Sequence, residues 1–220
     1  MSRRPPWRFV LVRHGETEWN KKGIYRGRAD VPLNARGRAQ ARAAGKALSG
    51  IRDAAVFASP LGRTVETAGL IRKSVKGASF AVEPGLQELD RGAWQGLTRA
   101  QARRRYPRIY EAWYHQPSRA RFPGGESLRA VQRRARAAFE RLRQDCRSET
   151  AVIVSHNVVL RALICSLLDL PLDRFQSFEL SPGSVTELVF EFGRYALRRL
   201  NDRCHLAQIE DVSQLLLSAD

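Results

Sequence analysis

The sequence predicts an α/β fold, a three-layer sandwich with a mostly parallel central sheet, and two observations carry this prediction. First, three short apolar runs are rich in branched residues, as is typical of strands buried on both faces of a parallel sheet. Second, these runs alternate with segments of helical periodicity, which is the pattern of layered α/β folds. The three runs are Phe9–Val12, Ala54–Ala58 and Ala151–Val154.

Helices are expected on both sides of these strands. Asn34 can cap a helix that runs to about Leu48 and stops at Gly50. Glu16–Val31 is polar and interrupted by glycines, which favours a loop over a functional site. The other expected elements are helices at Leu61–Lys73 and Val158–Leu168, a short strand at Phe80–Val82, an irregular segment at Leu86–Gly96 and a short helix at Val212–Leu217.

Two alternating segments near the end of the chain predict a hairpin. Ser184–Phe192 and Tyr195–Leu200 flank Gly193 and Arg194, which suit a two-residue turn. The hairpin adds one antiparallel edge strand to the sheet.

At 220 residues the chain is long enough for one domain, 1–220, and residues 95–145 are interpreted as a helical cap inserted over the sheet. Thr98–Gln116 is expected to be helical but polar, and a loop rich in proline and glycine follows it. Ser127–Cys146 is an arginine-rich helix whose apolar residues recur at helical spacing.

The net charge of +16 comes almost wholly from arginine, since only five of the 38 basic residues are lysines. The arginines are spread over several predicted helices without interleaved aromatic residues, which argues against a nucleic-acid partner. A basic surface exposed to solvent is the favoured interpretation. Its field attracts anionic small molecules toward a cationic pocket.

The sequence also predicts the compartment. No apolar run approaches the roughly 20 residues that span a bilayer, and no signal peptide is recognised, so no membrane partner is expected. Cys146, Cys165 and Cys204 include no close pair, which favours a reduced, cytoplasmic protein. Cys204 and His205 lack a second ligand pair, so no metal or other cofactor is expected.

Polar residues follow the three buried strands where each strand ends. Arg13 and His14 follow the first, residues 59–63 the second, and His156 the third. Because the carboxyl ends of parallel strands meet at one edge of a sheet, two histidines and two arginines, Arg13 and Arg63, should share one crevice. This set suits a phosphoryl group.

Each of these side chains has a part in phosphoryl transfer. The guanidinium groups of Arg13 and Arg63 match phosphate oxygens and stay charged. A neutral His14 can attack phosphorus, and a protonated His156 can donate to a non-bridging oxygen. Glu88 is the best-placed acid to protonate the leaving alkoxide and then activate water. Three other carboxylates are neighbouring candidates for this role: Glu16, Glu18 and Asp90.

Four segments in this order, RHGETEWN, SPLGRTVETA, LQELDRGAWQG and VSHNVVLRAL, resemble the histidine phosphatase superfamily, in its phosphoglycerate mutase-like branch. The resemblance runs from about Phe9 to His205. It implies that His14 is the phosphorylated nucleophile and that Glu88 is the proton donor. The phosphate pocket around His14 would consist of Arg13, Arg63 and His156. Further substrate contacts would come from Asn20, Gly27 and Asn157. Relatives of this type are often dimers, so a homodimer is expected.

The segment LQELDRGAWQG, with PGGESL and LNDRCHL further on, is similar to bacterial metal-independent phosphoserine phosphatases and α-ribazole phosphatases. The resemblance therefore implies a metal-independent phosphatase that hydrolyses a small phosphorylated metabolite. The enzyme alternative is a 2,3-bisphosphoglycerate-dependent phosphoglycerate mutase. A binding protein of the same fold without turnover is the alternative from another class, and retention of the whole residue set argues against it.

Two arginines bear on the substrate. Arg26 precedes Gly27 at a position where relatives usually have a smaller polar residue. It either meets a substrate carboxylate or second phosphate, or points into solvent. Arg91 occupies a position where the phosphoserine-directed enzymes have a histidine, which argues against phosphoserine as the substrate.

Overall fold

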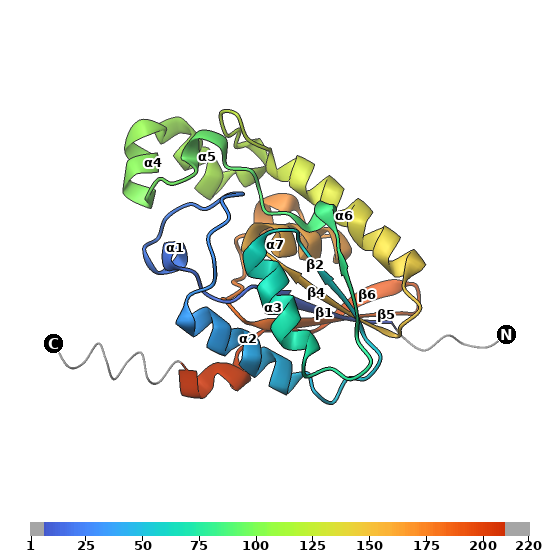
Figure 1. Ribbon diagram of the computed structural model, residues 1–220. Coiled ribbons are helices and arrows are strands. Elements are labelled where there is room, and N and C mark those ends of the chain that lie inside the picture. The colour runs from blue at the N-terminus through green and yellow to red at the C-terminus, as the bar shows by residue number, and fades with distance from the viewer. Residues whose placement is uncertain (1–6, 210–220) are drawn as a thin grey trace.

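A computed structural model describes residues 7–209, in which a six-stranded mixed sheet lies between layers of helices (Figure 1). The strand order is β3-β2-β4-β1-β5-β6. Strands β3, β2, β4 and β1 are parallel, and β5 runs antiparallel to both β1 and β6. The strands are β1 (Trp7–Arg13), β2 (Ala55–Ala58), β3 (Ser79–Val82), β4 (Thr150–Ser155), β5 (Val185–Glu191) and β6 (Arg194–Asp202). This arrangement confirms the predicted α/β class and the mostly parallel sheet.

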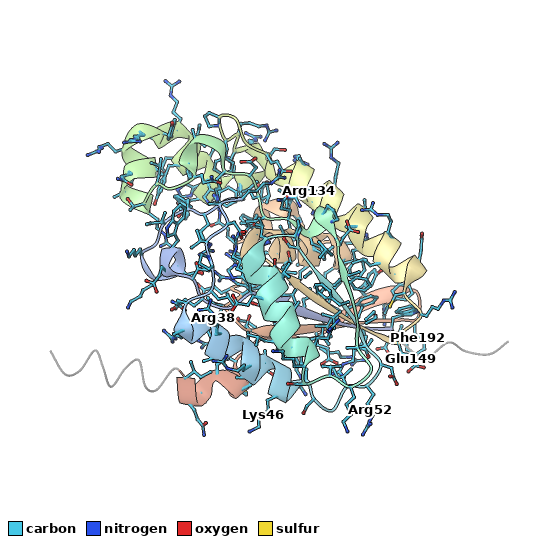
Figure 2. All side chains as sticks on the ribbon, in the orientation of Figure 1. Arg38, Lys46, Arg52, Arg134, Glu149 and Phe192 are labelled. Carbon is cyan, nitrogen blue, oxygen red and sulfur yellow. The ribbon has the colours of Figure 1, made fainter. Side chains whose placement is uncertain are left out.

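The predicted hairpin forms, with two corrections. The antiparallel strand is β5, second from the edge, and β6 is the edge strand. The turn residues are Phe192 and Gly193, one position earlier than expected, with φ of 53° and 79°. Two positive φ values match a type I′ turn, which suits the twist of paired strands. Figure 2 shows Phe192 at the end of the molecule away from the α4 and α5 helices.

The side chains of β1 are buried on both faces, as its apolar run predicts. Phe9 and Leu11 pack in one core cluster, and Val10 and Val12 pack in the other. Helices α2 (Ala35–Ala47) and α3 (Gly62–Arg72) cover one face of the sheet, and α6 (Leu128–Asp145) and α7 (Asn157–Leu167) cover the other (Figure 1). The sandwich therefore has three layers.

The segment predicted as a cap contains more than one kind of structure. The helical segment expected over 98–116 is present, but it is divided into two helices, α4 (Arg99–Arg105) and α5 (Pro107–His115), a division that was not predicted. Pro107 has no N–H to continue the first helix, and it takes the first position of the second. Helix α6 packs directly on the sheet, since the ring centroid of Phe139 lies 4.7 Å from that of Phe9.

The expected loop at 16–31 contains one short helix, α1 (Glu18–Lys21), which the sequence prediction missed. Thr17 caps it, and the side chain of Asn20 bonds back to the backbone of Thr17. Further along, the N–H of Tyr25 donates to the carbonyl of Leu97, and the N–H of Gly96 donates to the carbonyl of Tyr25. These bonds join the loop to the segment before α4.

The remaining named elements of the described chain are five 3₁₀ turns: η1 (Pro84–Leu86), η2 (Gly92–Trp94), η3 (Pro117–Arg119), η4 (Leu172–Arg174) and η5 (Cys204–Leu206). The helix expected at 212–217 lies outside the described residues. Within residues 7–209, none of the helices has the length and apolar character needed to cross a membrane.

Candidate active site

The carboxyl ends of adjacent strands bring two histidines together. Arg13 and Ser155 are register partners at the ends of β1 and β4, and His14 and His156 follow them directly. The two imidazole ring centroids lie 5.2 Å apart, and both side chains are fully buried. Arg63, at the start of α3 after β2, is also fully buried.

The protonation of His14 follows from its hydrogen bond. Nδ1 lies 2.6 Å from the carbonyl oxygen of Gly15. A carbonyl oxygen only accepts, so Nδ1 carries the proton and donates it. Nε2 then keeps its lone pair, and it is buried without a hydrogen-bond partner among residues 7–209. A nitrogen of this kind can act as a nucleophile.

Close backbone packing holds this turn in place. A Cβ atom on Gly15 would lie 2.2 Å from the carbonyl oxygen of Gly37 in α2, and one on Gly37 would lie 2.1 Å from the carbonyl oxygen of Glu16. Both positions therefore require glycine. The start of α2 thus supports the chain immediately after His14.

His156 is held by Ser59, the residue that follows β2. Its Nε2 lies 2.7 Å from Oγ of Ser59, which follows β2. Its Nδ1 is buried and has no hydrogen-bond partner in the described part of the chain. The bond to Ser59 fixes the orientation of the ring and leaves Nδ1 for a ligand.

Backbone carbonyls position the two predicted phosphate-binding arginines. Arg63 donates from Nη1 to the carbonyl of Ala29 at 2.7 Å and from Nη2 to that of Gly27 at 3.1 Å. Arg13 donates from Nη1 to the carbonyl of Leu180. Each Nε is buried and unpartnered within the described chain. Both cations are thus oriented by neutral groups and can still neutralise an anion.

Burial sets the charge state of the site. It lowers the pKa of His14 and of His156 well below the usual histidine value, and the charge of Arg63 lowers both further. Both imidazoles are therefore neutral near pH 7 in the absence of an anion. Burial also lowers the pKa of Arg13 to about 10, which leaves its guanidinium charged. The site therefore places the neutral imidazole of His14 beside charged arginines.

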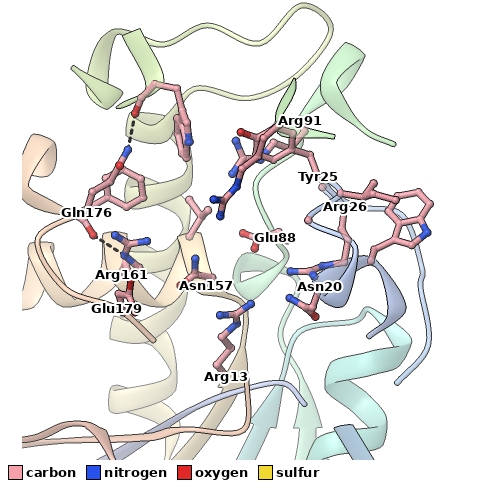
Figure 3. A pocket seen from close by; sticks show the side chains of 18 of the residues that line it. Arg13, Asn20, Tyr25, Arg26, Glu88, Arg91, Asn157, Arg161, Gln176 and Glu179 are labelled. Carbon is pink, nitrogen blue, oxygen red and sulfur yellow. Dashed lines mark hydrogen bonds between the residues drawn. The ribbon is translucent and has the colours of Figure 1, made fainter. Parts of the chain in front are cut away.

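A cavity of about 340 Å³ lies at this edge of the sheet (Figure 3), a size that suits a small metabolite. His14, Arg63 and His156 are fully buried and do not line it. Six of the predicted site residues do: Arg13, Asn20, Arg26, Gly27, Glu88 and Asn157.

Among the carboxylates proposed from the sequence as the acid, Glu88 alone lines the cavity. Its Oε1 accepts from the N–H of Leu89 at 2.8 Å. Arg134 of α6 holds the same segment, donating from Nη2 to the carbonyl of Glu88 at 3.1 Å, and Glu126 pairs with Arg134 at 2.9 Å. The other three carboxylates have different neighbours: Glu16 and Glu18 accept from Asn34, and Asp90 accepts from the N–H of Gly92.

The remaining predicted contacts also face the cavity. Oδ1 of Asn20 accepts from the N–H of Thr17 at 3.0 Å, which leaves its amide nitrogen for a ligand. Oδ1 of Asn157 is buried and unpartnered within residues 7–209. Arg26 points into the cavity and not into solvent (Figure 3). Burial, with the charges of Arg13 and Arg63, lowers the pKa of Arg26 to about 9.

Two residues that act on this site were not identified from the sequence. Arg161 lines the cavity, and burial lowers its pKa to about 10. It follows Asn157 by four residues on α7, a spacing that places both on one helix face and could have identified it. Arg134 is the other, and its role depends on contacts between distant segments. Within the described chain, the structure contains no cluster of three or more His, Cys, Asp or Glu side chains suited to a metal ion.

Comparison with known proteins identifies the family. Residues 9–203 match the model of the histidine phosphatase superfamily, branch 1. The chain is 35% identical to "Phosphoserine phosphatase 1" of Hydrogenobacter thermophilus, over 91% of this chain and 95% of that protein. It is 30% identical to a Salmonella paratyphi C protein named "Probable phosphoglycerate mutase GpmB", over 82% and 84% of the two chains.

Solved structures agree with this result. The native structure of a mycobacterial glucosyl-3-phosphoglycerate phosphatase is 30% identical, with a TM-score of 0.80 over 89% of this chain and 99% of that one. Bacillus stearothermophilus YhfR is 31% identical, with a TM-score of 0.84 over 90% and 98%. The chain therefore belongs to branch 1 of the histidine phosphatase superfamily, a family of phosphatases and mutases.

Proposed function

We propose that this protein is a metal-independent phosphatase that hydrolyses small phosphomonoesters through a covalent phosphohistidine on Nε2 of His14. One observation carries the proposal: Nδ1 of His14 donates to the carbonyl of Gly15, which leaves Nε2 as a buried, unprotonated nitrogen within the described site. The charges of Arg63, Arg26 and Arg13 all act on this imidazole. A phosphate group is the ligand that matches this combination.

In the first half-reaction, the Nε2 lone pair attacks phosphorus as the bond from phosphorus to the ester oxygen breaks. The carboxylic acid of Glu88 donates its proton to that oxygen, so the product leaves as a neutral alcohol. Arg13 and Arg63 neutralise the phosphoryl oxygens. His156 donates from Nδ1 to a non-bridging oxygen, and Ser59 holds the opposite nitrogen.

In the second half-reaction, water attacks the phosphohistidine. The Glu88 carboxylate takes a proton from this water, the new oxygen–phosphorus bond forms and the phosphorus–nitrogen bond breaks. Inorganic phosphate leaves, His14 recovers its Nε2 lone pair, and Glu88 is again protonated. In both steps the arginines supply positive charge and His156 supplies a hydrogen bond, which is why the proposal requires no metal ion.

Hydrolysis is preferred to mutase activity because two named phosphatases resemble this chain over nine-tenths of its length. The cavity lining also places Glu88 beside space large enough for water. A phosphoglycerate mutase is the second candidate, supported by the likeness to the Salmonella protein. A mutase would return the phosphoryl group to a substrate hydroxyl, whereas a phosphatase releases it to water.

The test is inorganic phosphate release from a panel of phosphomonoesters, with EDTA present. Wild type is compared with His14→Gln and with the control His115→Gln, whose side chain is 75% exposed at the end of α5. We expect wild type and the control to release phosphate at equal rates and His14→Gln to release none above background. Phosphate release by His14→Gln, or its loss with EDTA in wild type, would contradict the proposal. Transfer between substrate hydroxyls without release would favour the mutase.

A further inference from the structure

A second cationic group, the guanidinium of Arg91, faces the cavity on the side of Glu88 opposite Arg13. The guanidinium carbon of Arg91 lies 4.3 Å from the ring centroid of Trp113, 4.8 Å from that of Tyr25 and 5.1 Å from that of Phe122. We call these three residues the Arg91 cage. Arg91 and two cage residues, Tyr25 and Trp113, line the cavity. The cage comes from three segments: the loop after β1, α5 and the loop before α6.

The Arg91 cation forms no ion pair with a carboxylate within the described residues, and its Nη1 is buried there without a hydrogen-bond partner. Arg134 provides the contrast, because it pairs with Glu126 at 2.9 Å. Holding a buried cation without an opposite charge in contact is costly, and the aromatic faces offset only part of that cost. The arrangement is therefore suited to receive an anion from the cavity.

The position of Glu88 indicates which part of the substrate would carry this anion. Figure 3 shows Glu88 between Arg13 and Arg91 across the cavity. If Glu88 protonates the leaving oxygen and Arg13 binds the phosphoryl group, the alcohol part of the substrate extends toward Arg91. Among the described residues, five arginines and two glutamates line the cavity, a net charge of +3: Arg13, Arg26, Arg91, Arg99 and Arg161, with Glu88 and Glu179. One phosphate dianion therefore does not neutralise the cavity.

We infer that Arg91 binds a second anionic group on the alcohol part of the substrate. This inference rests on the proposed phosphatase function and names its substrate class: small phosphomonoesters that carry a carboxylate or a second phosphate. The Arg91 cage fixes the plane of the guanidinium, whose fork can then bind two oxygens of one anionic group. Arg91 is therefore a specificity-determining residue.

Arg26 has a different place. Its Nη1 donates to Oγ1 of Thr17 at 3.5 Å, three residues after His14, and besides burial the charges of Arg13 and Arg63 lower its pKa. It therefore lies at the phosphate end of the cavity, where every substrate of the enzyme has the same group. Arg26→Ala should weaken turnover of acidic and neutral substrates alike, whereas a change at Arg91 should separate them.

The experiment compares kcat/KM for matched substrates. The first pair is 3-phosphoglycerate and glycerol 3-phosphate, which differ by a carboxylate against a hydroxymethyl group. The second pair is propane-1,3-diol bisphosphate and 3-hydroxypropyl phosphate, which differ by the second phosphate. Wild type should prefer the acidic member of at least one pair by about tenfold or more, since a site built around a polar group rejects analogues that lack it. The pair with the larger preference identifies the anionic group.

Three variants complete the design. Arg91→Met should lower kcat/KM on the preferred acidic substrate by about 10- to 100-fold and change the neutral partner less than threefold. Arg91→Lys keeps the charge but lacks the two-pronged guanidinium, so its kcat/KM on the acidic substrate should lie between those of wild type and Arg91→Met. The matched control is Arg103→Met, because Arg103 is exposed on α4, lies 6.0 Å from the Tyr110 ring and does not line the cavity. It should behave as wild type.

Two results would overturn the inference: no acidic preference in wild type, or an equal loss on both members of a pair in Arg91→Met and Arg91→Lys. Competitive inhibition by glycerate, compared with glycerol, gives a second measurement that uses turnover of a single neutral reporter substrate. Glycerate should inhibit wild type more strongly, and Arg91→Met should remove the difference. If phosphate release depends on His14 but substitution of Arg91 does not change the preference for acidic substrates, only this inference fails. If no substrate shows His14-dependent release, the proposed function fails.

Discussion

Nδ1 of His14 lies 2.6 Å from the carbonyl oxygen of Gly15, and this contact determines which imidazole nitrogen is free. Because the carbonyl can only accept, the free nitrogen is Nε2. The turn that makes the contact is pressed against α2 through Gly15 and Gly37. Backbone geometry thus determines which nitrogen is free to be the proposed nucleophile, and substitutions that disturb this geometry should change both stability and turnover.

Gly37→Ala should damage both stability and activity. The new Cβ would lie 2.1 Å from a backbone oxygen of Glu16, so the turn beside His14 must move. We expect a loss of about 1–3 kcal/mol in the free energy of unfolding and at least a tenfold drop in kcat/KM. Denaturant unfolding and phosphate release measure the two effects.

The control is Gly69→Ala in α3, where a Cβ would meet no atom of the described residues within 4 Å. Alanine replaces glycine favourably in a helix interior, so this variant should be more stable by about 0.5–1 kcal/mol. Equal effects of the two substitutions would show that the Gly15–Gly37 contact does not constrain the site.

Ser59→Ala should slow catalysis without weakening substrate binding. The 2.7 Å bond from Ser59 orients His156, which is proposed to contact the phosphoryl group in the transition state. Losing one hydrogen bond of about 1 kcal/mol corresponds to roughly a fivefold lower kcat, with KM little changed. The matched control is Ser49→Ala, an exposed serine that donates to the carbonyl of Lys46. An increase in KM at constant kcat in Ser59→Ala would assign the contact to ground-state binding.

Glu88→Gln should affect poor leaving groups most. An alkyl alkoxide requires a proton as it departs, whereas a nitrophenolate leaves without one. We expect kcat on alkyl phosphates to fall by about 100-fold or more and the loss on p-nitrophenyl phosphate to be clearly smaller. Asp90→Asn is the control, because Asp90 is a neighbouring acid that does not line the cavity. Equal losses on both substrates in Glu88→Gln would exclude it as the acid.

Stability should depend on pH through the two buried histidines. Their pKa values are lowered in the folded state, mainly by burial, so below about pH 6.5 the unfolded chain binds more protons. Stability is therefore fully present above about pH 6.5 and decreases as pH falls toward the folded-state pKa, by up to about 1.4 kcal/mol per pH unit for each histidine.

Urea unfolding between pH 5 and 7, in buffers without phosphate, measures this dependence. His14→Gln should show a shallower pH dependence than wild type, because one of the two groups is removed. The exposed variant His115→Gln should keep the wild-type profile. An unchanged slope in His14→Gln would contradict the buried, neutral state of His14.

Much of the fold could be predicted because its signals are local. The apolar runs of β1, β2 and β4 are short, continuous and end at polar residues, so their burial and their shared edge could be inferred. The break at Pro107 also has a local cause, although the prediction overlooked it. The packing of Phe139 on Phe9 could not be predicted, since residues 130 positions apart meet only through the fold.

The candidate site divides in the same way. His14 and His156 follow strand ends, so their approach could be expected from the sequence. The pairing of Ser59 with His156 depends on the register between β2 and β4. The Arg91 cage draws Tyr25, Trp113 and Phe122 from separate segments, and no sequence pattern links them. Contacts between residues from separate segments, such as these, can be found only in the tertiary structure.

The most direct test of the central claim is to trap the phosphoenzyme. Wild type is mixed with a substrate and quenched in alkaline denaturant within milliseconds, and the modified residue is identified by mass spectrometry and ³¹P NMR. We predict an acid-labile phosphohistidine at His14, bonded through Nε2, and no such species in His14→Gln. Phosphate release with a phosphoryl group on another residue, or on Nδ1 of His14, would contradict this claim.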